Sequence, residues 1–200
     1  MITLRPCLRT IVLLLALTAA SAASAQSTTE PTVKELAVVD STSELETQIS
    51  ILLRERFKLN SSLQSAGSEA DNVIVALNIP ATEAQNLPQL SVHIDTAVWT
   101  RKSGADGEPL MQVISISSTA NVLHKEGAEG DVLKVINAVN TRPIPLHLFA
   151  ANRRVILMAN VVLQAGAPMP AEHFAALFYS VLKAWPPVLQ AFRQNNLLEE

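Results

Sequence analysis

Cysteine is nearly absent from this chain of 200 residues, and Cys7 is the only one. It precedes an apolar run, residues 11–20, which follows Arg5 and Arg9 and leads to Ala23-Ser24-Ala25, a small-x-small pattern that signal peptidase cleaves. An apolar run of about ten residues is too short to span hydrocarbon roughly 30 Å thick. We therefore expect residues 1–25 to be a signal peptide, with no stable membrane anchor after cleavage.

Removal of this leader would take away the only thiol in the chain. A mature chain without cysteine forms no disulfide, has no thiol nucleophile and offers no thiolate ligand to a metal. The leader predicts a periplasmic or secreted protein.

Aromatic residues and positive charge are also scarce. Only 4% of the residues are Phe, Trp or Tyr, and the net charge of −3 becomes more acidic when the leader and its two arginines are lost. Nucleic-acid-binding domains pair a basic face with stacking aromatics, so no nucleic acid is expected as a partner. The apolar share of 48% is ample for a packed core.

Catalytic and cofactor motifs are missing as well. The sequence has no G-x-S-x-G elbow, G-x-G-x-x-G fingerprint, Walker loop or H-E-x-x-H run. His93 and Asp95 share one face of a predicted strand, as a metal pair or an acid and base would, but a solvated strand face is the favoured interpretation. His147 is expected to face outward, and Glu172-His173 falls in the first turn of the last helix. We predict no enzyme, no catalytic residue, no metal and no cofactor.

Residues 26–40 form a polar stretch that we interpret as a flexible tether. After it, the chain contains a clear order of predicted helices and strands. Ser41 and Ser43 each precede a glutamate by three positions, as in a capping box. Apolar spacing predicts a helix over residues 41–57, and alternation predicts a three-strand meander. The predicted segments are strands at 73–79, 90–101 and 110–118, a helix at 131–140 capped by Asp131, strands at 146–150 and 155–163, and a last helix from Pro170.

Three features of the C-terminal half are candidates for binding. Arg153-Arg154 at the predicted hairpin tip could clamp a carboxylate or phosphate, although a solvated turn is favoured. The stripe of Phe174, Phe178 and Trp185 could line a groove, although core packing is favoured. The Pro186-Pro187 pair is expected to end or kink the last helix.

A helix broken at Pro186-Pro187 would turn the next apolar side chains away from the core. Val188, Leu189 and Phe192 are therefore the predicted interaction surface, used for a dimer or client contact. Replacement of Leu189 and Phe192 by serine is expected to change association without loss of the fold.

The run Val132-Leu133-Lys134-Val135-Ile136-Asn137-Ala138-Val139-Asn140, followed by the strand pair and the last helix, resembles the YbjN family (bacterial sensory transduction regulators) and its type III secretion chaperone-like fold. The resemblance covers residues 41–194. Pro143-Ile144-Pro145 and Arg153-Arg154 depart from the family's aromatic and acidic stretches. The resemblance implies one α+β domain, residues 41–200, with an antiparallel sheet packed by helices in the order helix, three-strand meander, helix, hairpin, helix.

The resemblance further implies a non-enzymatic, chaperone-like domain that binds another protein chain or a second copy of itself through apolar contacts. One alternative is a small-molecule or lipid-binding module with a pocket between the sheet and the last helix, marked by an apolar cavity of several hundred Å³. A hydrolase is the third hypothesis, marked by a serine and a histidine within about 3 Å in a cleft.

Overall fold

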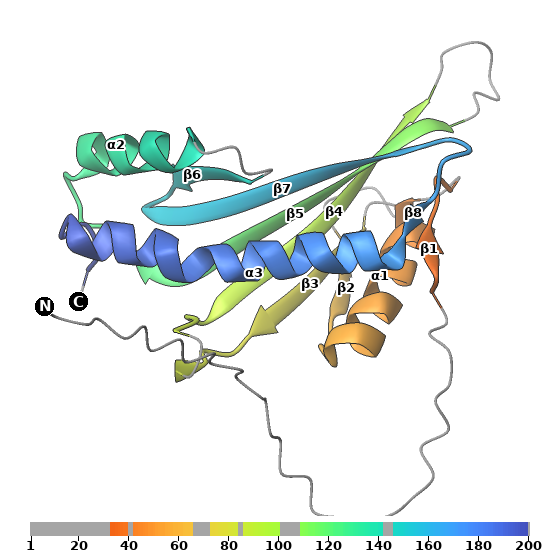
Figure 1. Ribbon diagram of the computed structural model, residues 1–200, viewed down its shortest axis with the longest axis horizontal. Helices are drawn as coiled ribbons and strands as arrows, with labels where there is room; N and C mark the ends of the chain where they lie inside the picture. Colours follow the sequence, from red (N-terminus) through yellow and green to blue (C-terminus); the bar gives the residue numbers. More distant parts are fainter. Residues whose placement is uncertain are drawn as a thin grey trace, which may run out of the picture. The chain divides into compact units, whose positions relative to one another are not determined.

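A computed structural model describes residues 33–39, 42–65, 73–83, 86–100, 109–141 and 146–199. They belong to one compact unit, Pro31–Glu200, and form three helices, a six-stranded antiparallel sheet and a two-stranded sheet (Figure 1). The expected leader, residues 1–25, lies outside the described residues. In chain order the elements are β1 (Glu35–Leu36), α1 (Thr42–Phe57), β2 (Ser62–Ser65), β3 (Val73–Ile79), β4 (Leu90–Thr100), β5 (Pro109–Leu123), α2 (Glu129–Asn140), β6 (His147–Ala151), β7 (Arg154–Gln164), β8 (Met169–Pro170) and α3 (Ala171–Gln194).

The large sheet has the strand order β2-β3-β4-β5-β7-β6, and each neighbouring pair is antiparallel. Helix α3 runs across β5 and β7, α1 packs on β3 and β4, and α2 packs beside β6 and α3 (Figure 1). The fold is therefore α+β, as the sequence predicts, with the helices layered on one face of the sheet.

Successive side chains along each strand point to opposite faces of this sheet. Val92, Ser118 and Leu157 lie in one cross-strand row and are buried under α3. The indole N–H of Trp185 donates to the Ser118 hydroxyl at 2.8 Å, which satisfies both polar groups in the core. No described helix covers the opposite side of the sheet, which we call the open face.

Asn140, the last residue of α2, holds the edge strand β6 in place. Its side-chain amide donates to the carbonyl of Leu148 and its side-chain oxygen accepts the N–H of the same residue, both at 2.8 Å. Because Leu148 faces Leu157 of β7 but bonds to Asn140, its backbone groups point away from the sheet. Two outward-facing polar groups of β6 are thus satisfied by one side chain.

The structure corrects three local predictions. The meander has four strands, because the polar residues Ser62–Ser65 pair with β3 as an exposed edge strand that lacks an apolar pattern. The expected tether does not include residues 33–39, since Leu36 is fully buried and β1 pairs with β8; residues 26–32 and 40 lie outside the described residues. Helix α2 begins at Glu129, so Asp131 is in its first turn and bonds to Lys134 rather than capping the helix.

The predicted interaction surface at Val188, Leu189 and Phe192 is wrong for this fold, because all three side chains are buried. Helix α3 continues through Pro186 and Pro187 to Gln194. Each proline leaves one carbonyl, four residues earlier, without its helical donor, which costs free energy but does not end the helix here. The apolar stripe therefore keeps its helical period, and Phe174, Phe178 and Trp185 are fully buried as core packing predicts.

The core also encloses a polar cluster under α1. The Glu46 carboxyl is fully buried and accepts the Thr96 hydroxyl at 3.1 Å, while Gln112 is buried and accepts the N–H of Val39 at 2.8 Å. Among the described residues, neither the second carboxyl oxygen of Glu46 nor the amide nitrogen of Gln112 has a hydrogen-bond partner. Burial, and more weakly the negative charge of Asp95, raise the pKa of Glu46 to about 7. The hydrogen bonds from Thr96 lower this pKa but do not offset the effect of burial.

The raised pKa of Glu46 predicts a loss of stability as the pH rises. In the unfolded chain the carboxyl ionises near 4.5, whereas in the folded protein it ionises near 7, so the folded state is favoured below the lower value and weakened above it. Glu46→Gln should remove this dependence and stabilise the protein at about pH 8 by up to roughly 3 kcal/mol, with little effect at about pH 4. Urea unfolding at both pH values measures the difference. Glu44→Gln, an exposed change on the same helix, is the matched control, and an unchanged pH dependence in Glu46→Gln would contradict the assignment.

Burial of the last turns of α3 predicts a different result for the serine replacements than the sequence does. Leu189→Ser leaves a cavity and an unpaired hydroxyl in the core, so it should lower the free energy of unfolding by roughly 3–5 kcal/mol. Thermal unfolding measures this loss, and Gln190→Ser, at an exposed neighbouring position, should have a small effect. A normally stable Leu189→Ser protein with altered association would instead support a surface role.

Candidate functional site

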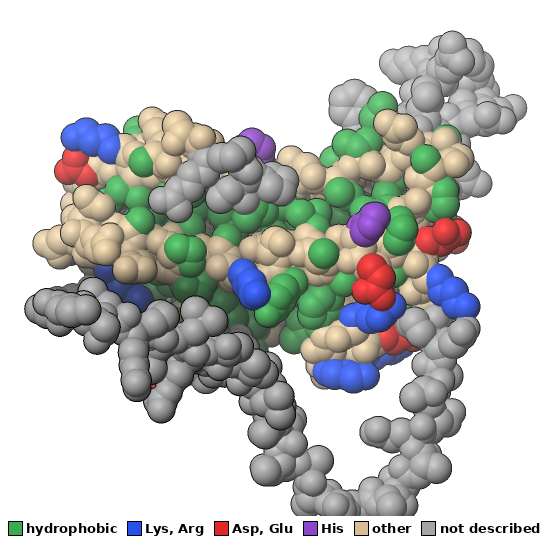
Figure 2. Space-filling view, in the orientation of Figure 1, with side chains coloured by type: hydrophobic (Ala, Val, Ile, Leu, Met, Phe, Trp, Pro, Cys, Tyr) green, Lys and Arg blue, Asp and Glu red, His purple; other side chains and the backbone are tan. Residues whose placement is uncertain are grey.

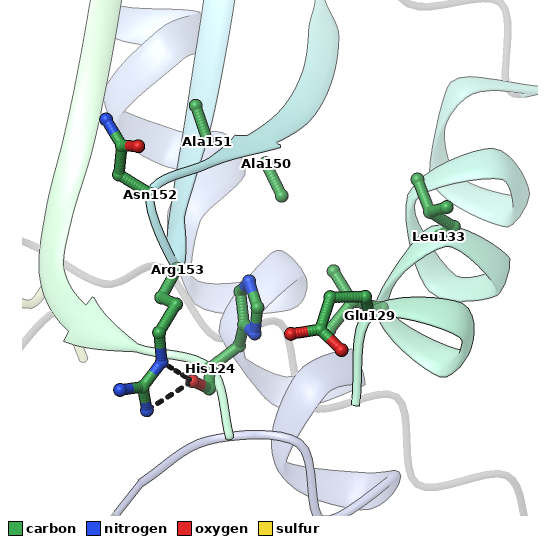
Figure 3. A pocket seen from close by; sticks show the side chains of 8 residues that line it. His124, Glu129, Leu133, Ala150, Ala151, Asn152 and Arg153 are labelled. Carbon is green, nitrogen blue, oxygen red and sulfur yellow. Dashed lines mark hydrogen bonds between the residues drawn. The ribbon is translucent and has the colours of Figure 1, made fainter. Parts of the chain in front are cut away.

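Four segments meet at one corner of the domain: the end of β5, the start of α2 a few residues later, the turn between β6 and β7, and the C-terminal residues after α3. The first three of them line a pocket of about 220 Å³, which we call the corner pocket (Figure 3). Its lining residues are His124, Glu129, Val132, Leu133, Ala150, Ala151, Asn152 and Arg153.

The turn between β6 and β7 brings Arg153 to this corner. Ala151 pairs with Arg154, so Asn152 and Arg153 form a two-residue loop, with φ values of 51° and 62°. Positive φ at both central residues defines a type I′ turn, in which glycine is preferred at the second position because a side chain there is strained. The sequence predicts a turn at residues 151–153, but it does not predict that Arg153 adopts a left-handed backbone conformation with positive φ.

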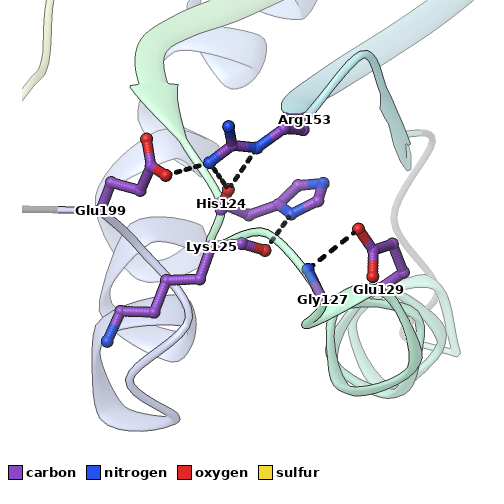
Figure 4. Close-up of polar contacts among 6 residues, drawn as sticks. All are labelled: His124, Lys125, Gly127, Glu129, Arg153 and Glu199. Carbon is purple, nitrogen blue, oxygen red and sulfur yellow. Dashed lines mark hydrogen bonds and ion pairs between the residues drawn. The ribbon is translucent and has the colours of Figure 1, made fainter.

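Contacts with β5 and the C-terminus hold Arg153 in this conformation (Figure 4). Its carbonyl accepts the N–H of His124 at 2.9 Å, and its guanidinium donates to the carbonyl of His124 at 3.2 and 3.0 Å. The guanidinium also forms an ion pair with Glu199. Arg153 therefore clamps a carboxylate, as one sequence hypothesis proposed, and that carboxylate belongs to the same chain. Arg154 is exposed.

The C-terminal residues run alongside the end of β5 and close the corner. The N–H of Lys125 donates to Leu197 at 2.8 Å, and the N–H of Glu199 donates to Leu123 at 3.0 Å. Leu197 is buried, and the Lys125 ammonium donates to the Asn196 side chain at 2.8 Å. His124 is thus held between the hairpin turn and the C-terminal segment.

His124, Glu129 and Arg153 are the titratable residues that line the pocket (Figure 3), and the Arg153 guanidinium is already paired with Glu199 (Figure 4). His124 is only 4% exposed, and its Nδ1 lies 3.1 Å from the carbonyl of Lys125. A carbonyl only accepts, so Nδ1 carries a hydrogen and Nε2 remains for the pocket. Glu129 accepts the N–H of Gly127 at 3.3 Å. Its own backbone N–H and that of Gly127, with smaller contributions from His124 and Arg153, lower the pKa of the Glu129 carboxyl.

This arrangement offers one imidazole and one carboxylate beside apolar walls, which suits binding. The His124 ring bonds to a backbone carbonyl rather than to a serine hydroxyl. Within the described ranges no group of three or more His, Cys, Asp or Glu side chains has the geometry to hold a metal. Neither His124, in the connection after β5, nor Glu129, the first residue of α2, belongs to a motif that the sequence displays.

The other titratable candidates do not gather into a site. His93 and Asp95 are exposed on the open face, and His147 is exposed on β6 of the same face. Glu172 forms an ion pair with Arg56 of α1 at 2.6 Å, which ties the start of α3 to that helix.

The open face is a second candidate surface. The cross-strand register places rows of neighbouring side chains on this face. In the four central rows Asp95 is the only acid and no lysine or arginine occurs, while the exposed Arg154, opposite Ala151, lies at the end of the same face. Val162 is 52% exposed and Phe149 is 36% exposed. The rows are Ala76–His93–Ser117–Met158–His147, Asn78–Ser91–Thr119–Ile156–Phe149, Asp95–Ser115–Asn160 and Ala97–Val113–Val162.

Grooves also flank α3 on the helix-bearing side, where Figure 2 shows apolar side chains on both sides of this helix. One groove, of about 220 Å³, includes Leu87, Tyr179 and Pro186; the other, of about 90 Å³, includes Leu146 and Pro187. Both are below the roughly 300 Å³ at which pockets for drug-sized ligands begin.

No protein-family model matches the chain, and no curated protein is significantly similar to it in sequence. None of the helices in the described part of the chain has the length and hydropathy needed to cross a membrane. The class of protein is therefore defined by its architecture, an α+β domain with helices on one face of an antiparallel sheet.

The strained turn at Arg153 predicts a specific order of stabilities. Arg153→Ala loses the guanidinium contacts and keeps a side chain at positive φ, whereas Arg153→Gly loses the same contacts but relieves the strain. We expect Arg153→Ala to cost roughly 1–3 kcal/mol and Arg153→Gly to cost about 1 kcal/mol less. Urea unfolding measures both, with Arg154→Ala as a control of small effect. Equal losses for the two variants would show that the backbone conformation is not strained.

Proposed function

We propose that the protein is an exported, non-enzymatic protein-interaction domain of the chaperone-like, YbjN type, and that it binds its partner on the open face. The single observation that carries this proposal is the composition of that face: half-exposed apolar side chains, with one acid and no lysine or arginine in its four central rows and Arg154 at one end.

Charge depletion supports a binding role because a solvated antiparallel face is ordinarily polar, whereas the centres of protein interfaces are poor in charged residues. Val162, Phe149, Met158 and Ile156 provide apolar area, and the serines along β5 provide hydrogen bonds without bulk. A partner that covers these rows would remove the apolar area from water.

The order of elements supports the proposed fold type. A helix, a strand meander, a helix that ends at Asn140, a hairpin and a long last helix follow one another as in the YbjN-like pattern, with β1, β2 and β8 as three additional short strands. Export to the periplasm or exterior rests on the leader pattern in residues 1–25.

A small-molecule-binding module is the second candidate, favoured by the apolar grooves beside Pro186 and Pro187. Their volumes suit small apolar groups. A hydrophobic fluorescent probe that is displaced by a short fatty acid, with loss of the effect in Leu182→Gln, would favour this function over the first.

Binding on the open face predicts that new charges there abolish client protection. The purified protein should suppress the aggregation of a chemically unfolded model protein, and Phe149→Glu with Val162→Glu should remove that activity, because a buried unpaired charge is costly. Light scattering measures aggregation. Tyr179→Glu is the control, since Tyr179 is 50% exposed on α3, away from the open face.

The control defines the outcomes of this experiment. Retention of activity in Tyr179→Glu with its loss in the double variant supports the open face as the binding surface. No suppression by the unaltered protein, or equal losses in both variants, counts against the proposed function.

A further inference from the structure

We propose that the corner pocket binds a primary alkylammonium group, the chemical head of an aliphatic amine or of a lysine side chain. The proposal concerns a site separate from the open face and goes beyond the proposed function.

The walls of the pocket fit a short methylene stem. Val132, Leu133 and Ala150 line one side of the space, and Leu133 is 55% exposed although it is a large apolar residue. A stem laid against these side chains would remove apolar area from water, as the stems of long cationic side chains do. The volume of about 220 Å³ restricts the occupant to a small group.

The polar groups fit an ammonium head. An ammonium carries three donors and no acceptor, so it needs acceptors around it. The Nδ1–H of His124 is engaged by the carbonyl of Lys125, and in the neutral imidazole Nε2 is then an acceptor. Figure 3 shows the Glu129 carboxylate directed toward His124 at the border of the same space. Two acceptors from different elements therefore face one small volume.

The charges around the pocket favour a cation. Arg153 is paired with Glu199, and Lys134 is paired with Asp131. Glu129 takes part in no ion pair among the described residues, and its lowered pKa keeps it ionised at neutral pH. A carboxylate or phosphate in the pocket would meet this charge, whereas an ammonium would neutralise it.

The lining also distinguishes between kinds of cation. Quaternary ammonium groups are bound by the faces of Trp, Tyr and Phe, and none of the eight lining residues is one of these. A guanidinium binds a carboxylate best through two parallel hydrogen bonds, but one oxygen of Glu129 already accepts the N–H of Gly127. A primary ammonium needs only a single free carboxylate oxygen.

The experiment is a titration of the purified protein with n-butylammonium near neutral pH, followed by NMR of the His124 imidazole and the amides of Ala150 and Ala151. We expect saturable shifts confined to the corner pocket. Butyrate and 1-butanol, which share the stem but not the charge, should produce no saturable shift there.

Glu129→Gln should weaken n-butylammonium binding by about tenfold or more. The matched control is Glu126→Gln, which removes the same charge from an exposed turn residue that does not line the pocket. Equal weakening by both variants, saturable binding of butyrate or 1-butanol in the pocket, or the absence of any shift with n-butylammonium would overturn the proposal.

A second arm identifies the source of the head group. Nα-acetyl-lysine methylamide presents the same ammonium as a peptide does. Tighter binding of this compound than of n-butylammonium assigns the pocket to a protein side chain, and the reverse order assigns it to a free amine. The result is independent of client protection by the open face, so each proposal can fail without the other.

Discussion

The helices α1, α2 and α3 bury their apolar stripes against a single face of a six-stranded sheet, and the rest of the structure depends on this one-sided layering. Burial of each large apolar side chain stabilises the fold by roughly 1.5–3 kcal/mol. The long stripe of α3, from Phe174 to Phe192, lies over the central strands and joins the three helices into one core. Among the described residues, the same layering leaves the second face of the sheet without a helix, so the open face is a consequence of how the core is built.

Much of this architecture could be predicted because it depends on local periodicity. Helical spacing identified α1, α2 and α3, and alternation identified β4 and β5, since these patterns reflect which face of each element is buried. Prediction failed where a local rule was overridden by tertiary packing. The rule that proline ends a helix suggested an exposed segment after Pro186-Pro187, but the burial of Val188, Leu189 and Phe192 compensates for the lost hydrogen bonds. Ser62–Ser65 has no apolar pattern because it is an exposed edge strand, and its pairing with β3 could not be read from its own residues.

The corner pocket could not be predicted for a different reason. Its parts come from residues near 124, 129, 153 and 199, and their proximity depends on the pairing of β5 with β7 and on the path of the chain after α3. Arg153 carried a local signal, because it is a basic residue at a predicted hairpin tip. Its ion pair with Glu199 could not be predicted without knowing where the C-terminal residues lie. His124 carried no signal at all, because a histidine in a polar connection is ordinarily solvated, whereas here backbone bonds on two sides enclose it.

The bidentate contact between Asn140 and Leu148 has a consequence for self-association. A sheet edge with unpaired backbone groups is a template for strands of other molecules, and it is a common start of fibrillar aggregation. At Leu148, the second residue of β6, the amide of Asn140 occupies the backbone donor and acceptor that an incoming strand would need. A strand of another molecule would have to displace the Asn140 side chain before it could pair with Leu148, which disfavours end-to-end stacking of molecules through this edge.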